Sequence, residues 1–220
     1  LNSSSIAVVD VLSSLAEVAV TRKYTRPKLT EGTRIKILDG RHPSLEMIMG
    51  QNEFVPNSLE IGDGGSSLII VTGPNMAGKS TYMRQAALIV LMAQMGSFVP
   101  AKSAEIGVVD RIFTRVGAFD DLTARQSTFM VEMIETANIL NNATDRSLVV
   151  LDEIGRGTST FDGMALAWAV AERIVQMKTR TLFATHFHHL TDMAKLYHGV
   201  KNVHTLARET GDSIVFLHRV

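Results

Sequence analysis

A glycine-rich segment that follows an apolar run contains the residue types that hold phosphate groups. Residues 73–81 read GPNMAGKST and come directly after the strand-like run SLIIVT. The glycines let the backbone curl so that N–H groups point inward, while Lys79 can reach β- and γ-phosphates and Ser80 can offer its hydroxyl to Mg²⁺. A helix predicted over 79–94 would direct its N-terminus and dipole at the anion. The pattern predicts a nucleoside triphosphate site and outweighs the alternative, a plain glycine-rich turn.

Two carboxylates end a second apolar run, SLVVLDE at residues 147–153. A buried strand of this kind delivers its last side chain to the carboxyl edge of a parallel sheet, where ligands bind in open α/β folds. Asp152 is therefore predicted to hold Mg²⁺, and Glu153 to orient or deprotonate the attacking water. The alternative is a solvated pair of acids, which the phosphate-binding segment upstream disfavours.

A second helix start offers another place for an anion. Ser127 or Thr128 can cap a helix predicted over 128–142, and the N–H groups at such a helix end attract negative charge. Because one nucleotide already has its own loop, a spare helix end suggests contact with the nucleotide of a partner subunit. The residues alone favour simple capping.

A third predicted strand, 180–185, ends in a hydroxyl and an imidazole, Thr185 and His186. At the sheet edge that also carries the acids, His186 is placed to sense a γ-phosphate. A zinc site formed by His186, His188 and His189 is the alternative, and the absence of cysteine and of a matching second ligand pair disfavours it.

The composition is that of a globular α/β protein without a dominant charge. Lysine plus arginine equals aspartate plus glutamate at 22 each, so no overall field draws the chain to DNA or to an anionic membrane. The absence of cysteine fits a reducing compartment. We expect no signal peptide and no apolar run near 20 residues, hence a cytoplasmic protein without membrane contact. An apolar stripe over 5–23 without a capping start suggests that the chain begins inside a longer helix.

Strands and helices alternate along the core, which predicts a mainly parallel sheet with right-handed crossovers. The glycines and hydroxyls of the loop GRGTSTFDG, 155–163, allow a cap by Ser159, Thr160 or Asp162. The segments 200–207 and 213–219 are predicted to form an antiparallel hairpin at the edge of the sheet. The predicted strands are 33–38, 67–72, 147–152 and 180–185, with pieces near 104–116, and the predicted helices are 79–94, 128–142 and 162–177, with a short one from 187.

Four motifs in order, GPNMAGKSTYMRQ, STFMVEM, LDEIGRGTSTFDG and FATHFHHL, resemble the ATPase domain of the MutS family of DNA mismatch-repair proteins. The resemblance runs nearly from end to end. It implies a P-loop NTPase of ABC type that binds ATP and Mg²⁺, with two nucleotides at a subunit interface, each completed by a signature segment of the partner. On this basis residues 1–30 are expected to be the end of a lever or connector helix with a linker, and residues 31–220 the ATPase domain.

The resemblance also implies roles for particular residues. It makes Glu153 the catalytic glutamate, His186 the sensor of the γ-phosphate, and Ser80 and Asp152 the Mg²⁺-linked pair. The signature residues that act in trans would be Ser127 and Thr128. The residues expected to bind the nucleotide are Phe54 and His218, whose rings would sandwich adenine, and Gly73, Pro74, Asn75, Met76, Ala77, Gly78, Lys79, Ser80 and Thr81. Ala77 stands where many family members have glycine, so this position should need no left-handed backbone.

The family's partners follow from the resemblance as expectations. They are a second copy or a paralogue bound through the ATPase face, a MutL-type protein, and mismatched DNA bound through domains missing here, on the nucleoid. None of the nine phenylalanines is followed two places later by glutamate, so the family's mismatch-reading motif is absent, and we expect a weak ATPase that does not itself recognise mismatches. The alternatives are a MutS paralogue acting in recombination and another ABC ATPase used as a nucleotide-gated dimerisation switch; LSGGQ-like signatures, usual in transporters, are missing.

Overall fold

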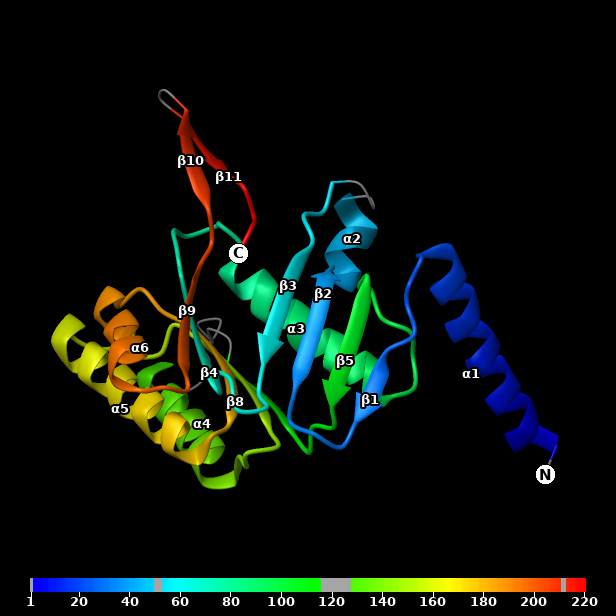
Figure 1. The fold of residues 1–220 in the computed structure, drawn as a ribbon, viewed down its shortest axis with the longest axis horizontal. Helices are drawn as coiled ribbons and strands as arrows, with labels where there is room; N and C mark the ends of the chain where they lie inside the picture. Colours follow the sequence, from blue (N-terminus) through cyan, green and yellow to red (C-terminus); the bar gives the residue numbers. More distant parts are fainter. Residues whose placement is uncertain (1, 50–52, 116–127, 211–212) are drawn as a thin grey trace. The chain divides into compact units, whose positions relative to one another are not determined.

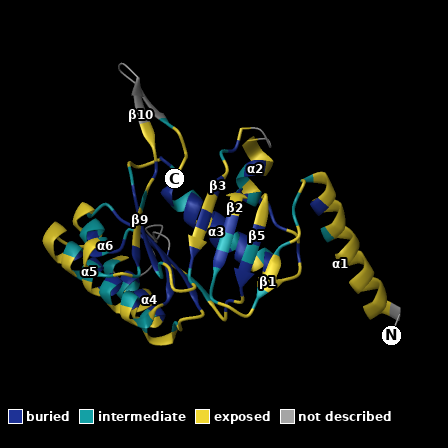
Figure 2. Cartoon of the chain, in the orientation of Figure 1, coloured by how far each residue is buried: buried dark blue, intermediate teal, exposed yellow. Residues whose placement is uncertain are grey.

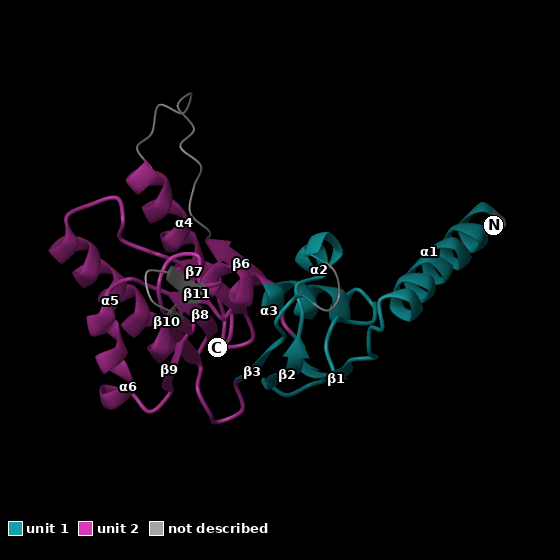
Figure 3. Cartoon of the chain, turned by 90° about the horizontal axis from the view of Figure 1, so that it is seen from above, with its two compact units in different colours: residues 1–60, 85–108 teal, residues 61–84, 109–220 magenta. Residues whose placement is uncertain are grey.

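The computed structural model describes residues 2–49, 53–115, 128–210 and 213–220, which form two compact units. Figure 3 colours them separately. Unit 1 comprises residues 1–60 and 85–108, and unit 2 comprises residues 61–84 and 109–220. The expected boundary at residue 30 stays a prediction. In the structure, residues 31–60 cluster with the N-terminal helix in unit 1.

Unit 2 is built on a parallel sheet with strand order β6-β7-β8-β4-β9. Every residue of β4, β7 and β8 is buried, as expected for strands covered on both faces. The strands are β4 (Leu68–Thr72), β6 (Ile112–Arg115), β7 (Leu148–Asp152), β8 (Arg180–Ala184) and β9 (Val200–His204). This parallel α/β arrangement confirms the predicted fold class.

The helices of unit 2 cover the sheet with apolar faces. In Figure 1, α4, α5 and α6 gather beside the strands of this unit. Their contacts form one core in which Ile139 of α4 and Ile174 of α5 pack with Leu151 and Phe183 of the sheet. The elements are α4 (Thr128–Asn142), α5 (Thr160–Met177), the 3₁₀ turn η1 (His188–Asp192) and α6 (Met193–Leu196). The predicted helix 128–142 is confirmed, and the predicted helix from 162 begins two residues earlier.

The C-terminal hairpin is shorter than predicted. Residues 200–204 do not pair with the chain's end but form β9, which lies parallel to β4 in the main sheet. The antiparallel hairpin consists of β10 (Ala207–Thr210) and β11 (Ser213–Phe216), which form a separate two-stranded sheet. The prediction was wrong for residues 200–204, because a parallel partner so distant in sequence leaves no local signal, whereas a nearby turn does. Ala207 does pair in the hairpin, with Phe216.

Unit 1 contains a mixed sheet with strand order β1-β5-β2-β3. Strand β5 is parallel to β1 and antiparallel to β2. Burial alternates along β3, so this sheet has one packed face and one open face. The elements are α1 (Asn2–Thr21), β1 (Lys28–Thr30), β2 (Ile35–Gly40), α2 (Pro43–Met49), β3 (Asn57–Ile61) and β5 (Ser103–Gly107). Helix α3 (Lys79–Gln94), predicted with these bounds, contributes residues to both units.

Helix α1 is apolar and exposed. Figure 2 shows it almost entirely in the colour of exposed residues, and Val9 and Leu12 are 66% and 60% exposed. Within the 19 residues Ser3–Thr21, a stretch of 18 residues has a mean hydropathy of 1.5, so this helix is long and apolar enough to cross a membrane by length and composition alone. This corrects the expectation that no apolar run near 20 residues exists. It is weak evidence for a membrane, because core helices of soluble proteins and signal sequences pass the same test.

Candidate functional site

The parallel sheet brings the three predicted segments to one edge. Strand β8 lies between β4 and β7, and its last residue, Ala184, is in register with both Val71 and Asp152. The residues that follow these three strands therefore leave the sheet side by side at its carboxyl edge. This edge is where ligands bind in open α/β folds.

The loop between β4 and α3 has the backbone geometry of a cradle. Positive φ angles occur at Gly73 (133°), Met76 (65°) and Gly78 (99°). Glycine is required at position 73, since a Cβ there would lie 2.0 Å from the Oγ1 of Thr205. Ala77 is fully buried and is not among the residues with positive φ, in agreement with the expectation that it needs no left-handed backbone. Pro74 and Asn75 belong to this loop, and Ser80 and Thr81 lie in the first turn of α3.

The ammonium group of Lys79 lies across this loop. Its Nζ donates to the carbonyl of Gly73 at 2.8 Å and to that of Pro74 at 3.1 Å. Burial lowers the pKa of Lys79, and the charges of Glu153 and Asp152 act in the opposite direction. The loop therefore holds a partly desolvated cation that an incoming phosphate would find already in place.

Ser80 and Asp152 form the pair that suits a divalent cation. The Ser80 hydroxyl donates to the Asp152 carboxylate, and burial raises the pKa of Asp152. Within the described part of the chain, Oδ1 of Asp152 is buried and has no hydrogen-bond partner. A hydroxyl beside a carboxylate oxygen that lacks a partner is a donor set for a hard cation such as Mg²⁺, so these residues fit the expected metal.

Glu153 is held in an unusual backbone conformation beside two cationic or polar partners. Its φ is 59°, and its N–H donates to the carbonyl of Ala184 at 2.9 Å. One carboxylate oxygen contacts Nε2 of His186, and the other forms an ion pair with Nη1 of Arg156. Nη2 of Arg156 in turn lies 2.9 Å from Nε2 of His186. A non-glycine residue with positive φ costs about 1–3 kcal/mol and is typical of functional sites.

Arg156 was missed by the sequence reasoning. The loop that contains it was singled out for capping, and the structure confirms one cap, since Ser159 precedes α5 and its hydroxyl accepts from the N–H of Asp162. The ion pair of Arg156 depends on where β7 and β8 place Glu153 and His186, which no local pattern reveals. These three side chains line one hollow at the sheet edge.

The remaining predicted residues are placed only in part. His218 lies against the phosphate-loop region, because a Cβ added to Gly78 would be 3.3 Å from its Nδ1. Phe54 is buried in unit 1, and Thr128 is the first residue of α4. Ser127 lies outside the described residues. The roles of these residues in nucleotide binding stay predictions.

A family model described as "MutS domain V" matches residues 69–220. The chain belongs to the MutS domain V family. This domain is the ATPase domain of MutS proteins, so the predicted family and enzyme class are confirmed.

Curated relatives agree with this assignment. The chain is 61% identical over 217 residues to the DNA mismatch repair protein MutS of Acetivibrio thermocellus. The matched residues make up 98% of the chain and 25% of that protein. It is 58% identical over 225 residues to the protein of the same name from Thermodesulfovibrio yellowstonii, covering 100% of the chain and 26% of that protein. The chain therefore spans about a quarter of the length of the curated relatives it matches.

Proposed function

We propose that this MutS domain V binds ATP with Mg²⁺ at the carboxyl edge of its parallel sheet and hydrolyses it within a dimer. The observation that carries the proposal is the meeting of Lys79, the Ser80–Asp152 pair and Glu153 at that edge. A cation for the phosphates, a donor set for the metal and a base for water are the parts that phosphoryl transfer requires.

Each residue has a role that follows from its position. Lys79 and the N–H groups of the loop would bind the β- and γ-phosphates, and Ser80 and Asp152 would hold Mg²⁺, which neutralises charge on the phosphate oxygens. Glu153 would accept the proton of the attacking water, and His186 would contact the γ-phosphate. Glu153 is paired with Arg156 and His186 in the described state, so these contacts would have to rearrange when water and nucleotide enter.

Completion of each site by a partner subunit is the second part of the proposal. Thr128 begins α4. This helix end would not be needed for the nucleotide that the loop 73–81 would hold. We infer that Ser127 and Thr128 contact the γ-phosphate bound by the partner, either a second copy or a paralogue. Phe54 and His218 would enclose the adenine.

The wider role is proposed from the relatives, which are called DNA mismatch repair proteins. We infer that ATP binding here signals to DNA-binding domains elsewhere in such a protein, and that a MutL-type partner responds, in the cytoplasm and on the nucleoid. A role in recombination is the alternative, and repair of mismatched DNA by a full-length protein carrying this domain would separate the two.

Mixing two inactive variants tests the shared site. A Lys79→Ala subunit lacks the lysine of the loop but keeps Ser127, and a Ser127→Ala subunit lacks the serine but keeps the loop. A heterodimer of the two contains one complete composite site, so its ATPase rate should exceed that of either variant alone and approach half of the wild-type rate. The control is a mixture of two Lys79→Ala preparations. No gain in heterodimers that demonstrably form would show that Ser127 acts within its own subunit.

A further inference from the structure

Helix α4 carries a buried carboxylate that the proposed chemistry does not use. Glu132 is 6% exposed and lies one turn after Thr128. Its Oε1 accepts a hydrogen bond from the N–H of Gly155 at 2.6 Å, and its Oε2 lies 3.7 Å from Nη2 of Arg115 on β6. A buried carboxylate is costly unless its oxygens have partners, so this residue fastens α4 to two other elements.

The hydrogen bond reaches the backbone two residues after Glu153. Gly155 has a φ of 91°, and a Cβ added there would lie 2.5 Å from the carbonyl oxygen of Gly163. The loop 155–163 therefore closes tightly on itself and has little room to shift. Holding the N–H of Gly155 also holds the two peptide units that lead back to Glu153.

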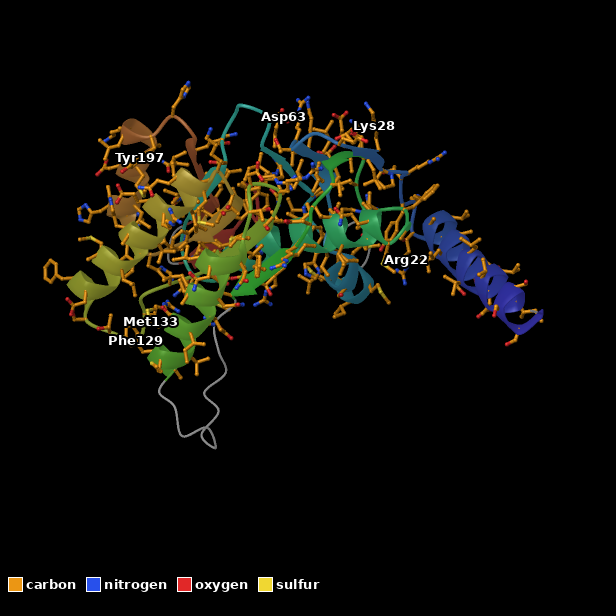
Figure 4. All side chains as sticks on the ribbon, turned by 90° about the horizontal axis from the view of Figure 1, so that it is seen from below. Arg22, Lys28, Asp63, Phe129, Met133 and Tyr197 are labelled. Atoms are coloured by element: carbon orange, nitrogen blue, oxygen red, sulfur yellow. The ribbon has the colours of Figure 1, made fainter. Side chains whose placement is uncertain are left out.

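A second contact joins the same helix to the same loop. A Cβ added to Gly157 would lie 2.9 Å from the Cβ and 3.2 Å from the Cα of Phe129, so the loop packs directly on the first turn of α4. Figure 4 marks Phe129 and Met133 on this part of the helix. Polar and steric contacts thus act together, and a displacement of the start of α4 must move the loop or break both.

We propose that Glu132 is a positioning residue that transmits the occupancy of the partner's nucleotide site to Glu153 of its own subunit. The start of α4, which is expected to sense the partner's γ-phosphate, would move Gly155 through Glu132 and so alter how Glu153 is presented to water. This inference rests on the proposed composite site. It predicts that the hydrolysis rate at one site depends on the partner site through one carboxylate.

The chain offers a matched control on the same helix. Glu135 also pairs with Arg115, with 2.9 Å between Oε2 and Nε, but its side chain is 50% exposed and it is not bonded to Gly155 in the described residues. Glu135→Ala removes an ion pair of Arg115 and leaves the bond to the loop in place. Glu132→Ala removes the bond to the loop as well.

The experiment uses heterodimers of a MutS protein of the relatives' length that carries this chain as its domain V. The measured subunit hydrolyses ATP beside a partner bearing either Glu153→Gln, whose site stays filled, or Lys79→Ala, whose site stays empty. The ratio of the two single-turnover rates reports the coupling. For the wild-type subunit we expect a ratio that differs from one by at least about fivefold, within the usual range of coupling between sites.

The substitutions then decide the role of Glu132. Glu132→Ala should bring the ratio to one and lower kcat while the KM for ATP changes little; Glu135→Ala should keep the wild-type ratio. Glu132→Gln retains an oxygen that can accept from Gly155 and should restore the ratio. If Glu132→Ala does not fold, Glu132→Asp replaces it, since the shorter side chain keeps the charge but loses its reach to Gly155.

Two outcomes would overturn the inference in different ways. A wild-type ratio of one would mean that the two sites are not coupled, and Glu132 would transmit nothing; the composite site would still be decided by the mixture of Lys79→Ala and Ser127→Ala subunits. A wild-type ratio well away from one that persists in folded Glu132→Ala or Glu132→Asp would leave the composite site standing and exclude Glu132 as the link.

Discussion

The two sheets of this chain differ in how they are buried and in what their edges carry. In unit 2 every residue of β4, β7 and β8 is buried, and the segments after these strands contain the phosphate loop, Glu153 and His186. In unit 1 burial alternates along β3, and the one predicted nucleotide residue is Phe54, just before that strand. The predicted site residues are thus concentrated where strands are covered on both faces.

The difference has a physical reason. A strand that is hydrogen-bonded on both sides and packed on both faces has little freedom to move. The residue that follows its end is therefore held in place as well. A half-exposed sheet constrains its ends less and tolerates substitution on its open face. If this explanation is right, matched substitutions in the two units should have very different effects on hydrolysis.

The largest difference in kcat is expected between substitutions of two glutamates, Glu153 in unit 2 and Glu46 in unit 1, each of which pairs with an arginine. Glu153→Gln should lower kcat by about 10²- to 10⁴-fold and leave ATP binding intact, because an amide cannot accept the proton of water. Single-turnover hydrolysis together with equilibrium ATP binding measures both quantities. An unchanged kcat would refute the role of Glu153 as the base.

The matched residue in unit 1 is Glu46, whose Oε2 lies 3.0 Å from Nε of Arg41 and whose side chain is 2% exposed. Glu46→Gln should lower the melting temperature, since a buried ion pair is weakened, but should not change kcat of the folded protein. A loss of hydrolysis in folded Glu46→Gln would break the contrast between the units.

Two leucines test the same contrast in stability. Leu151 of β7 is 1% exposed and Leu12 of α1 is 60% exposed. Leu151→Ala should lower the free energy of unfolding by about 2–5 kcal/mol, because it leaves a cavity in the core of unit 2. Leu12→Ala should change it by less than about 0.5 kcal/mol, as for an exposed position. Urea unfolding of both variants checks this, and equal losses would mean that α1 is packed in solution.

Parts of the fold with strong local signals were predictable from the sequence. Helix α3 and helix α4 were predicted with their observed bounds because apolar spacing and caps mark them, and β4, β7 and β8 stand out as apolar runs. What failed depends on distant contacts. The parallel pairing of β9 with β4 was taken for a hairpin, and the grouping of residues 85–108 with the N-terminal part in unit 1 has no sequence signature.

The candidate site divides in the same way. Lys79, Asp152 and Glu153 could be proposed as site residues because loop glycines and strand-terminal acids are local patterns. Arg156 and Glu132 were missed because their importance lies in contacts across the fold, with Glu153 and with the N–H of Gly155. Sequence reasoning therefore singled out the groups that are proposed to react more readily than the residues that are proposed to position them.

The smallest of these effects concerns the lysine of the phosphate loop. Lys79 donates to the carbonyls of Gly73 and Pro74, so its ammonium is already placed at the loop before any phosphate binds. Charged hydrogen bonds of this kind contribute about 1.5–3 kcal/mol each, so Lys79→Ala should weaken binding of a non-hydrolysable ATP analogue by roughly ten- to a hundredfold.

Comparing the loss of affinity for ADP with the loss for the triphosphate analogue shows which phosphate the lysine contacts. Because Lys79 is expected between the β- and γ-phosphates, ADP should lose less affinity than the triphosphate analogue, and calorimetric titration of both ligands measures the difference. The control in unit 1 is Lys36→Ala, which removes an exposed pair with Glu60 at 3.8 Å and should leave both affinities unchanged. Equal weakening of ADP and the analogue by Lys79→Ala would move the lysine away from the γ-phosphate. Weakening by Lys36→Ala as well would show that nucleotide binding depends on both sheets, and the contrast between them would fail.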